Sequence, residues 1–381
     1  MPFFFEDKRC HFPKGKIQLQ TQYPFYEPGN TVQGIIYLEI AEPVMASHIT
    51  LEIKGGEKSS FIRHWDEHVQ DGDQTRVVHH ADKLKASKKF LEYKGNVFDI
   101  QGGMLNPGVY SVEFATMLPE KLPSSIGFKH KKSREEPKAK IKYYVKAVLH
   151  THDKHDEMKF KQVLIIREKP VALREGDQQS ETSHIKTWCC VDQGHSTMSS
   201  VFNKNVFLPN EHCEGSIKVN NEECKLAVSS VQFFVEQRLT VKAKNHSHTY
   251  THRLVEQAVA GPGPGVGDWQ TQLALDLSKI KYEVADMKKK KGVQKKVSPE
   301  DKFMMAGVQA AVHGKSITNE YFLVVEVKYD GCVCCVDLPD SRTPMTIIPL
   351  VNPACFGFEV PQTGWMPIPL GNFTVNLTEH H

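Results

Sequence analysis

Apolar and polar side chains alternate along several short stretches of the chain, with a period of two residues. The clearest example is KIKYYVKAVLH, residues 140–150. Five apolar positions fall on one face of this stretch: Ile141, Tyr143, Val145, Ala147 and Leu149. The opposite face carries mostly lysines: Lys140, Lys142 and Lys146. This alternation predicts a β-strand with one buried and one solvent-facing side, as in an antiparallel sheet.

Other stretches share these features: they are short, rich in Val, Ile, Leu and Tyr, and bounded by turn-forming Gly, Pro or Asn. In the first half of the chain we predict strands at residues 16–22, 32–40, 48–54, 140–150 and 159–167. In the second half we predict strands at 213–219, 226–238, 321–329 and 332–338. Helical periodicity is confined to a short stretch at 300–312. The pattern therefore predicts an all-β fold.

One phrase of the sequence occurs twice. Residues 26–40 are YEPGNTVQGIIYLEI and residues 207–219 are FLPNEHCEGSIKV, each with a tight turn, then a glycine and a strand. The two glycines, Gly34 and Gly215, are about 180 residues apart, and Tyr143 and Tyr321 repeat at nearly the same interval. Because an amphipathic sheet must cover its apolar face, we expect two tandem sandwiches of antiparallel sheets.

The repeat divides the chain into two domains and two further segments. We assign residues 1–172 to an N-terminal β-sandwich and residues 185–350 to a C-terminal β-sandwich. The polar stretch 167–183 joins the two domains, and we set the bounds of the linker at residues 173–184. Residues 351–381 form a C-terminal tail.

The composition is that of a soluble globular protein. The chain has 381 residues, 24% of them charged, and a formal net charge of +3, so nucleic acid binding by the whole molecule is not expected. The opening MPFFFEDKRCH lacks the apolar segment of a signal peptide, and no run is long enough to span a membrane. Nine cysteines, an odd number without a secretory signal, favour reduced thiols in the cytosol.

Two local clusters of positive charge are candidate sites for phosphate or inositol phospholipid headgroups, because several nearby cations attract an anionic surface. The first precedes the predicted strand at 140–150 and contains Lys129, Lys131, Lys132 and Arg134. The second contains Lys288, Lys289, Lys290, Lys291, Lys295 and Lys296. The alternative is that both are solvated loops. No aromatic residues lie among these lysines, which disfavours single-stranded nucleic acid.

The first predicted strand is a candidate for binding an extended peptide along its edge, because exposed backbone groups accept a new strand. It lies near the start of the chain and is flanked by Lys14 and Lys16, which are the candidate cargo-binding residues. The alternative is an edge strand that lysines protect from pairing.

Candidate catalytic or metal-binding residues are scarce. The segments HTHDKHDE (150–157) and HSHTYTH (246–252) are rich in histidine, but we expect solvated side chains at hairpin turns rather than a zinc site. Cys189, Cys190, Cys332, Cys334 and Cys335 are expected to be small buried hydrophobic residues in strands. No common nucleophile, zinc-protease or nucleotide-binding motif is present, so we expect no enzyme activity, metal or cofactor.

Four segments together resemble the arrestin family, and in particular its arrestin-domain-containing, or alpha-arrestin, branch. They are YEPGNTVQGIIYLEI, LPSSIGFKHKKSREEPKAKIKYYVKAVL, KTWCCVDQGHSTMSSVFNKNVFLPNEHCEGSIKV, and SITNEYFLVVEVK followed by VDLP. They keep the family's order and spacing across most of residues 14–340. The resemblance implies two immunoglobulin-like, arrestin-type sandwiches in an elongated bilobed molecule whose concave faces bind tails of membrane proteins.

The chain departs from the family at three places. Visual and beta-type arrestins carry a Lys-Lys pair in the first strand that senses receptor phosphate, whereas Cys10 and His11 stand near that place here, followed by Lys14 and Lys16. An arginine expected before the first turn is missing from QTQYPFYEPG. Alpha-arrestins usually recruit ubiquitin ligases through Pro-Pro-x-Tyr motifs, and the 381 residues contain none.

The resemblance implies a non-enzymatic trafficking adaptor. It would bind cytoplasmic tails of membrane receptors or transporters and link them to endocytic, sorting or ubiquitination machinery, such as ubiquitin ligases or coat proteins. We expect it in the cytoplasm, peripheral at the plasma membrane or endosomes through acidic phospholipids. One alternative is a retromer-type endosomal coat subunit of the same fold, in a stable complex with other coat proteins. A metal-dependent enzyme is the other alternative, and it would require bound zinc or iron.

Overall fold

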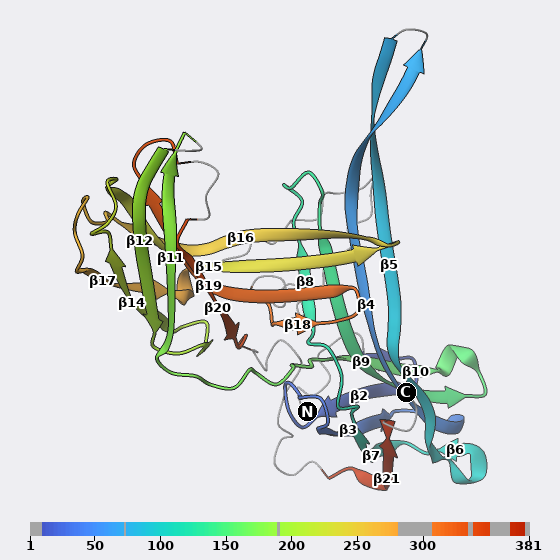
Figure 1. Ribbon diagram of the computed structural model, residues 1–381. Coiled ribbons are helices and arrows are strands. Elements are labelled where there is room, and N and C mark those ends of the chain that lie inside the picture. Colours follow the sequence, from blue (N-terminus) through green and yellow to red (C-terminus); the bar gives the residue numbers. More distant parts are fainter. Residues whose placement is uncertain are drawn as a thin grey trace.

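The molecule is all-β and has two lobes, each a sandwich of two sheets, as the sequence predicts (Figure 1). The computed structural model describes residues 10–71, 74–188, 191–280, 307–333, 338–350 and 366–377. Within these ranges the helical elements are three short 3-10 turns: η3 (Gln101–Gly103), η4 (Lys154–Asp156) and η5 (Leu277–Lys279). No helix in the described ranges has the length and apolar content needed to cross a membrane.

The N-terminal lobe contains two sheets. The first has the order β1-β2-β3-β7-β21: β1 (His11–Phe12), β2 (Gly15–Thr21), β3 (Thr31–Ile40), β7 (Gly108–Met117) and β21 (Ile368–Asn376). The second has the order β10-β9-β4-β5, with β8 added to β9 and β6 added to β4: β4 (Val44–Asp71), β5 (Gln74–Asp99), β6 (Met104–Leu105), β8 (Ile126–Lys129), β9 (Lys138–Thr151) and β10 (Met158–Leu164).

The C-terminal lobe repeats this two-sheet plan. One sheet has the order β11-β12-β14-β17: β11 (Asp177–Thr187), β12 (Val191–Phe202), β14 (His212–Asn220) and β17 (Trp269–Asp276). The other has the order β13-β20-β19-β15-β16, with β18 added to β19: β13 (Val206–Phe207), β15 (Val228–Ala243), β16 (His246–Val259), β18 (Val312–His313), β19 (Ile317–Tyr329) and β20 (Asp340–Ile347).

The glycines of the repeated phrase have the same structural role in both lobes. Gly34 of β3 lies directly opposite Phe114 of β7, and Gly215 of β14 lies directly opposite Phe202 of β12. A Cβ atom added to Gly34 would lie 2.5 Å from the Phe114 ring, and one added to Gly215 would lie 3.2 Å from the Phe202 ring. Each glycine therefore leaves room for a phenylalanine ring over the backbone.

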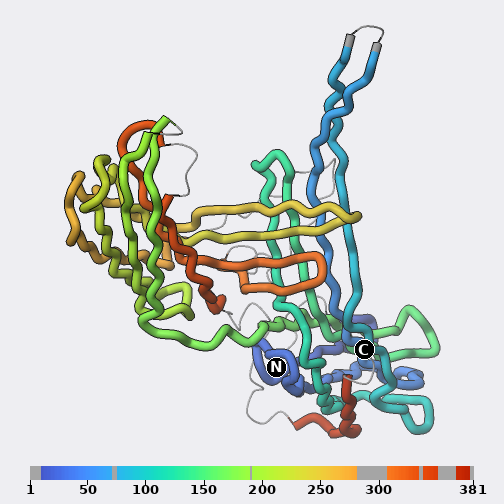
Figure 2. The backbone as a smooth tube through the Cα atoms, in the orientation of Figure 1, coloured from blue at the N-terminus to red at the C-terminus, as the bar shows by residue number. Residues whose placement is uncertain are grey.

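The two lobes share a packed seam, which Figure 2 shows as the ends of the C-terminal strands reaching the N-terminal lobe. Leu239, Val241 and Ala243 at the end of β15 belong to the same buried cluster as the core of the N-terminal lobe. The Ser59 hydroxyl donates a hydrogen bond to the Lys242 carbonyl oxygen at 2.6 Å across this seam. The C-terminal lobe thus covers part of the inner face of the β4–β9 sheet.

The segment expected to be a C-terminal tail supplies a strand to the N-terminal lobe. β21 runs parallel to β7, from Ile368 opposite Tyr110 to Asn376 opposite Met117. Leu377, directly after β21, is fully buried in the N-terminal core. The sandwich that begins at the N-terminus is therefore completed by residues near the other end of the chain.

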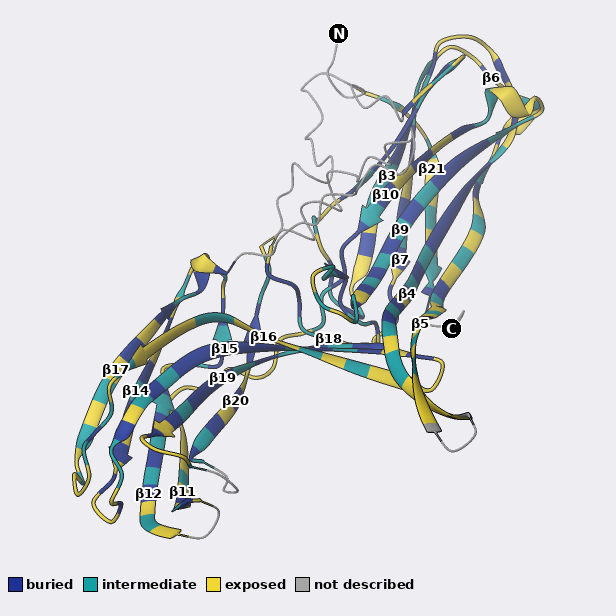
Figure 3. Ribbon diagram, turned by 90° about the horizontal axis from the view of Figure 1, so that it is seen from above, coloured by how far each residue is buried: buried dark blue, intermediate teal, exposed yellow. Residues whose placement is uncertain are grey.

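Strands β4 and β5 are much longer than their neighbours and project from the lobe as a two-stranded arm (Figure 1). β4 has 28 residues and β5 has 26. β4 pairs with β9 only up to Ser60, whereas its pairing with β5 continues to Asp71 and Gln74. Exposed residues dominate the free end of this hairpin (Figure 3).

Three sequence predictions require correction. In the strand predicted at 332–338, residues 334–337 lie outside the described residues, Cys332 is not in a strand, and Val333 makes only an isolated bridge with Thr187; the next strand, β20, begins at Asp340. In the predicted helix 300–312, residues 300–306 lie outside the described residues, and 307–312 are not helical. β11 begins at Asp177, within the stretch 167–183 read as polar linker, because its outward face is polar and hides the strand pattern.

Candidate anion-binding surface

The outer face of the β10-β9-β4-β5 sheet is built from the lysine side of the alternating pattern. The apolar positions of β9 face the core, and the alternate positions Lys138, Lys140 and Lys142 face outward. Directly paired residues lie on the same face of a sheet, so strand register decides which neighbours join these lysines. Lys58 of β4 lies opposite Lys140, and Lys129 of β8 lies opposite Lys138.

The register brings together six lysines from four strands at the end of the sheet nearest the arm. Ser60 lies opposite both Lys138 of β9 and Lys85 of β5, and Ile62 lies opposite Lys83. We define the lysine surface as Lys58, Lys83, Lys85, Lys129, Lys138 and Lys140. Its members are spread over 82 positions of the sequence, from Lys58 to Lys140.

Like charges act on one another within the lysine surface. Burial, together with the positive charges of Lys140, Lys83 and Lys58, holds the pKa of Lys138 below its ordinary value. Burial and the charges of Lys131 and Lys138 likewise lower the pKa of Lys129, against a weaker opposing effect of Glu136. Within the described residues, neither Lys129 nor Lys138 forms an ion pair. Like charges repel here, so an anion placed among them is stabilised.

The same face changes character further from the arm, where carboxylates balance the lysines. Lys54 pairs with Glu52 and, at 3.1 Å, with Glu92. Lys146 lies 3.6 Å from Glu52. Burial alone would raise the pKa of Glu52, but the hydrogen bond from Lys54 and the charges of both lysines lower it below its ordinary value. Glu52 and Glu92 therefore offset lysine charge in this part of the face.

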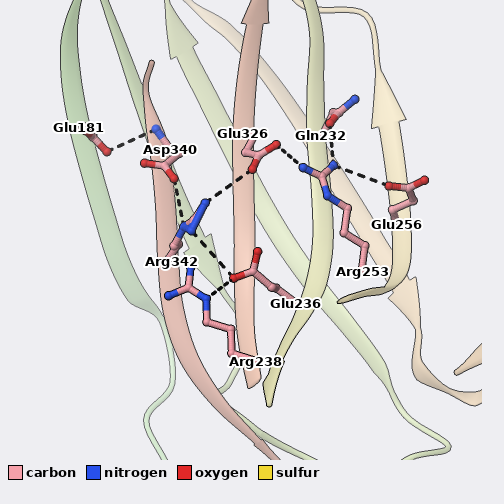
Figure 4. A network of polar contacts seen from close by, with 9 residues as sticks. All are labelled: Glu181, Gln232, Glu236, Arg238, Arg253, Glu256, Glu326, Asp340 and Arg342. Carbon is pink, nitrogen blue, oxygen red and sulfur yellow. Dashed lines mark hydrogen bonds and ion pairs between the residues drawn. The ribbon is translucent and has the colours of Figure 1, made fainter. Parts of the chain in front are cut away.

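A sheet of the C-terminal lobe offers a useful contrast. On one face of its β20-β19-β15-β16 sheet, three arginines alternate with carboxylates (Figure 4). Arg253 lies 2.6 Å from Glu326, Arg238 lies 2.6 Å from Glu236, and Arg342 lies 3.7 Å from Glu326 and 3.9 Å from Glu236. These cations are satisfied within the lobe, so this face is a weaker candidate for an anionic partner.

A cavity of about 850 Å³ at the seam between the lobes is the competing candidate site. Its lining includes Lys121, Lys169 and Lys315, but also Glu120 and Glu168. Glu168 is engaged: it accepts hydrogen bonds from the backbone amides of Ser124 and His313 and lies 2.7 Å from the His313 ring nitrogen. Mixed charges at this seam make it less selective for anions than the lysine surface.

The first predicted basic cluster is only partly assembled in the structure. Lys129 belongs to the lysine surface, whereas Lys131, Lys132 and Arg134 lie in the turn between β8 and β9. This turn folds against the arm: the Arg134 carbonyl oxygen lies 3.1 Å from the His64 ring nitrogen. The second cluster, Lys288 to Lys291 with Lys295 and Lys296, lies outside the described residues.

The candidate cargo-binding lysines both make ion pairs. Lys14 lies 2.6 Å from Asp156, and Lys16 lies 3.3 Å from Glu39. β2 lies between β1 and β3 in the sheet, although β1 pairs with it only at Gly15 and Lys16. A role for this strand in binding an extended peptide stays a prediction.

The predictions for cysteine and histidine need two corrections. Cys332 is exposed rather than buried, because it lies in a turn and not in a strand, while Cys189, Cys190, Cys334 and Cys335 lie outside the described residues. Of the histidines in HSHTYTH, His246 directly follows the hairpin turn at residues 244–245, as expected, whereas His248 and His252 lie further along β16. The His248 ring stacks on Phe61 across the seam, with centroids 5.8 Å apart. Within the described ranges, no three His, Cys, Asp or Glu side chains converge as metal ligands.

Five members of the lysine surface were not among the predicted site residues: Lys58, Lys83, Lys85, Lys138 and Lys140. The alternation of lysines in 138–146 is the signal that could have found two of them. Lys58, Lys83 and Lys85 require the register of β4 and β5, which no local pattern gives.

Comparison with known proteins matches both lobes. The model of the arrestin (or S-antigen) N-terminal domain matches residues 15–172, and that of the arrestin (or S-antigen) C-terminal domain matches residues 192–350. The chain is 26% identical over 248 residues to arrestin domain-containing protein A of Dictyostelium discoideum, covering 65% of this chain and 42% of that protein. It is 25% identical over 262 residues to arrestin domain-containing protein 17 of Caenorhabditis elegans, covering 65% and 58%. The chain thus spans about half the length of these relatives.

Proposed function

The chain belongs to the arrestin family, and on that premise we propose that it is an adaptor that binds acidic cytoplasmic tails of membrane proteins on its lysine surface. The family consists in general of non-enzymatic adaptors. The single observation that carries the proposal is that the strand register gathers six lysines on one outer sheet face of the N-terminal lobe, where their charges help to lower the pKa of Lys138 and Lys129.

An extended peptide fits this surface because the lysines lie in rows across neighbouring strands. Strands in a sheet are spaced about 4.8 Å apart, so lysines on adjacent strands present charges at intervals comparable to those of side chains along an extended chain. Each cation near an acidic or phosphorylated side chain contributes on the order of 0.5–1 kcal/mol at an exposed site. Several such contacts together give a binding energy that depends strongly on salt.

The second half of an adaptor's task is to bring the tail to other proteins. We propose that these partners belong to the endocytic, sorting or ubiquitination machinery, and that the adaptor acts on the cytoplasmic side of the plasma membrane or of endosomes. Binding tails through charge alone leaves the rest of the molecule, including the C-terminal lobe, available for such a partner.

A binding experiment with matched variants tests the tail-binding step. The probe is a fluorescent peptide rich in phosphoserine and glutamate, compared with the same peptide carrying serine and glutamine. Replacing Lys58 and Lys138 with glutamine removes two charges, and we expect the dissociation constant to rise about 10-fold, as two contacts of this kind predict. Fluorescence anisotropy at low and raised ionic strength measures the effect.

The control replaces Lys218 and Lys328, two exposed strand lysines of the C-terminal lobe, with glutamine. This variant loses the same net charge and should bind the acidic peptide as the unmodified chain does. Equal weakening in both double variants would mean that net charge alone attracts the peptide, and it would contradict the proposed surface. Binding of acidic phospholipid vesicles without binding of the peptide would also contradict it.

A further inference from the structure

The free end of the β4–β5 arm has no other strand to support it. From Phe61 onward, β5 is the one strand that pairs with β4 within the described residues, and the turn between β8 and β9 adds a hydrogen bond from the Ile62 amide to the Glu135 carbonyl oxygen at 2.6 Å. β5 is the last strand of its sheet, so its outer backbone edge is unpaired along the part of the chain that the structure describes. A two-stranded ribbon alone is marginally stable in water, and three or more strands are generally needed.

The outer edge of β5 is protected in one part and unprotected in another. The part nearest the lobe carries Lys83, Lys85, Lys88 and Lys89, and lysines on an edge strand oppose pairing with other chains. The arm itself, residues 61–82, contains neither lysine nor proline. Val77 on this arm is 42% exposed. The protection thus stops where the arm begins.

We propose that the arm edge, residues 74–82 of β5, is an interaction surface that pairs in antiparallel fashion with the same edge of a second copy of this chain. The pairing joins two ribbons into one four-stranded sheet, which supplies the strands that each arm lacks. The partner is a second copy of the chain because the edge is self-complementary. When two copies pair about a central residue, a positive side chain of one copy lies opposite a negative side chain of the other.

One antiparallel register of the two edges places Arg76 opposite the carboxylate of Asp82. Opposed residues must lie on the same face, so a two-fold axis relating two antiparallel strands passes between a residue and its own copy. With His79 at the axis, Arg76 lies opposite Asp82 of the second copy, and the reverse pair repeats it. Val77 then lies opposite Ala81 on the other face, which covers the exposed valine.

Neighbouring registers lose this match. With Val78 at the axis, Arg76 lies opposite His80, and with His80 at the axis it lies opposite Leu84. Asp82 already accepts a hydrogen bond from the Trp65 indole at 2.7 Å, but a carboxylate keeps further acceptor capacity for an arginine. The register centred on His79 therefore pairs Arg76 with a carboxylate that the Trp65 indole already orients within the arm.

A charge-swap experiment on the full chain tests the proposal. Light scattering behind size-exclusion chromatography, over a range of concentrations, should show dimers. Arg76→Glu and Asp82→Arg each place like charges opposite one another twice, and each should raise the dimer dissociation constant about 10-fold or more. The double variant restores opposite charges and should return to the constant of the unmodified chain. A Lys218→Glu control on the C-terminal lobe should have no effect.

Cross-linking tests the register itself. His79→Cys should form a disulfide between copies under mild oxidation, identified as a 79–79 peptide by mass spectrometry, whereas Thr75→Cys should not. A chain that remains monomeric, a double variant as weak as the single variants, or an arm edge that captures an unrelated extended peptide instead would each overturn the proposal. These outcomes leave the binding of acidic tails at the lysine surface unaffected.

Discussion

Lys138 shows how a sheet concentrates charge from residues that are ordinary in the sequence. Its own strand provides one lysine neighbour, but β4, β5 and β8 bring others from distant segments. Burial and these charges lower the pKa of Lys138, whereas Lys54, on the same face, forms ion pairs with Glu52 and Glu92. Two lysines on one sheet face therefore differ as candidates for anion binding because the charges of their neighbours differ.

His252 of β16 makes the seam sensitive to pH. Burial, aided by the charge of His130, lowers the pKa of His252, whose ring stacks on Tyr250. As pH falls through about 6.5, the ordinary pKa of histidine, His252 binds a proton in the unfolded chain but not yet in the folded chain. Stability is therefore present above this value and is lost below it. We expect the melting temperature to fall between about pH 7 and about pH 5.

The variant His252→Gln removes this proton difference, so its melting temperature should fall less over the same pH range. His150, whose pKa is also lowered, chiefly by burial, accounts for part of the remaining decline. Thermal melts of both proteins across pH, followed by circular dichroism, measure the difference. Identical pH dependence in the two proteins would show that His252 does not contribute.

At the scale of elements, the alternating pattern was a good guide wherever one face of a strand is apolar. β3, β9, β14 and β19 were predicted within a few residues of their observed bounds. β5 and β12 were missed because both of their faces carry many polar residues, such as QTRVVHHADKLK and DQGHSTMSS. Long-range pairing stabilises such strands, and a local pattern does not contain that information.

β21 was also missed, because it lies within residues 351–381, which were read as a tail. Its burial gives a stability prediction: Leu377 is fully buried in the N-terminal core, whereas Ile368 at the start of the strand is 56% exposed. Leu377→Ala should lower the free energy of unfolding by about 2–4 kcal/mol, as truncation of a buried leucine does. Ile368→Ala is the matched control and should cost less than about 1 kcal/mol.

Chemical denaturation of both variants measures these values. Similar small losses in the two variants would show that β21 is not docked on β7 in solution. Equal large losses would mean that the exposed start of the strand contributes as much as its buried end, which the burial pattern does not allow.

At the scale of the whole molecule, the duplication could be predicted from the sequence and the seam could not. Gly34 and Gly215 marked the repeat because each faces a phenylalanine on the neighbouring strand. Nothing in the local sequence of β15 indicates that Leu239 and Val241 pack in the other lobe. The lysine surface is similar, since only the tertiary register joins Lys58 and Lys83 to Lys138.

Lysine footprinting on the full chain tests the proposed anion-binding surface most directly. An amine-acetylating reagent is applied with and without the peptide rich in phosphoserine and glutamate, and modified lysines are identified by mass spectrometry. We expect the peptide to protect Lys58, Lys83, Lys85, Lys129, Lys138 and Lys140, while Lys218 stays as reactive as before. Protection of Lys121, Lys169 and Lys315 at the seam cavity instead, or no protection of the lysine surface, would contradict it.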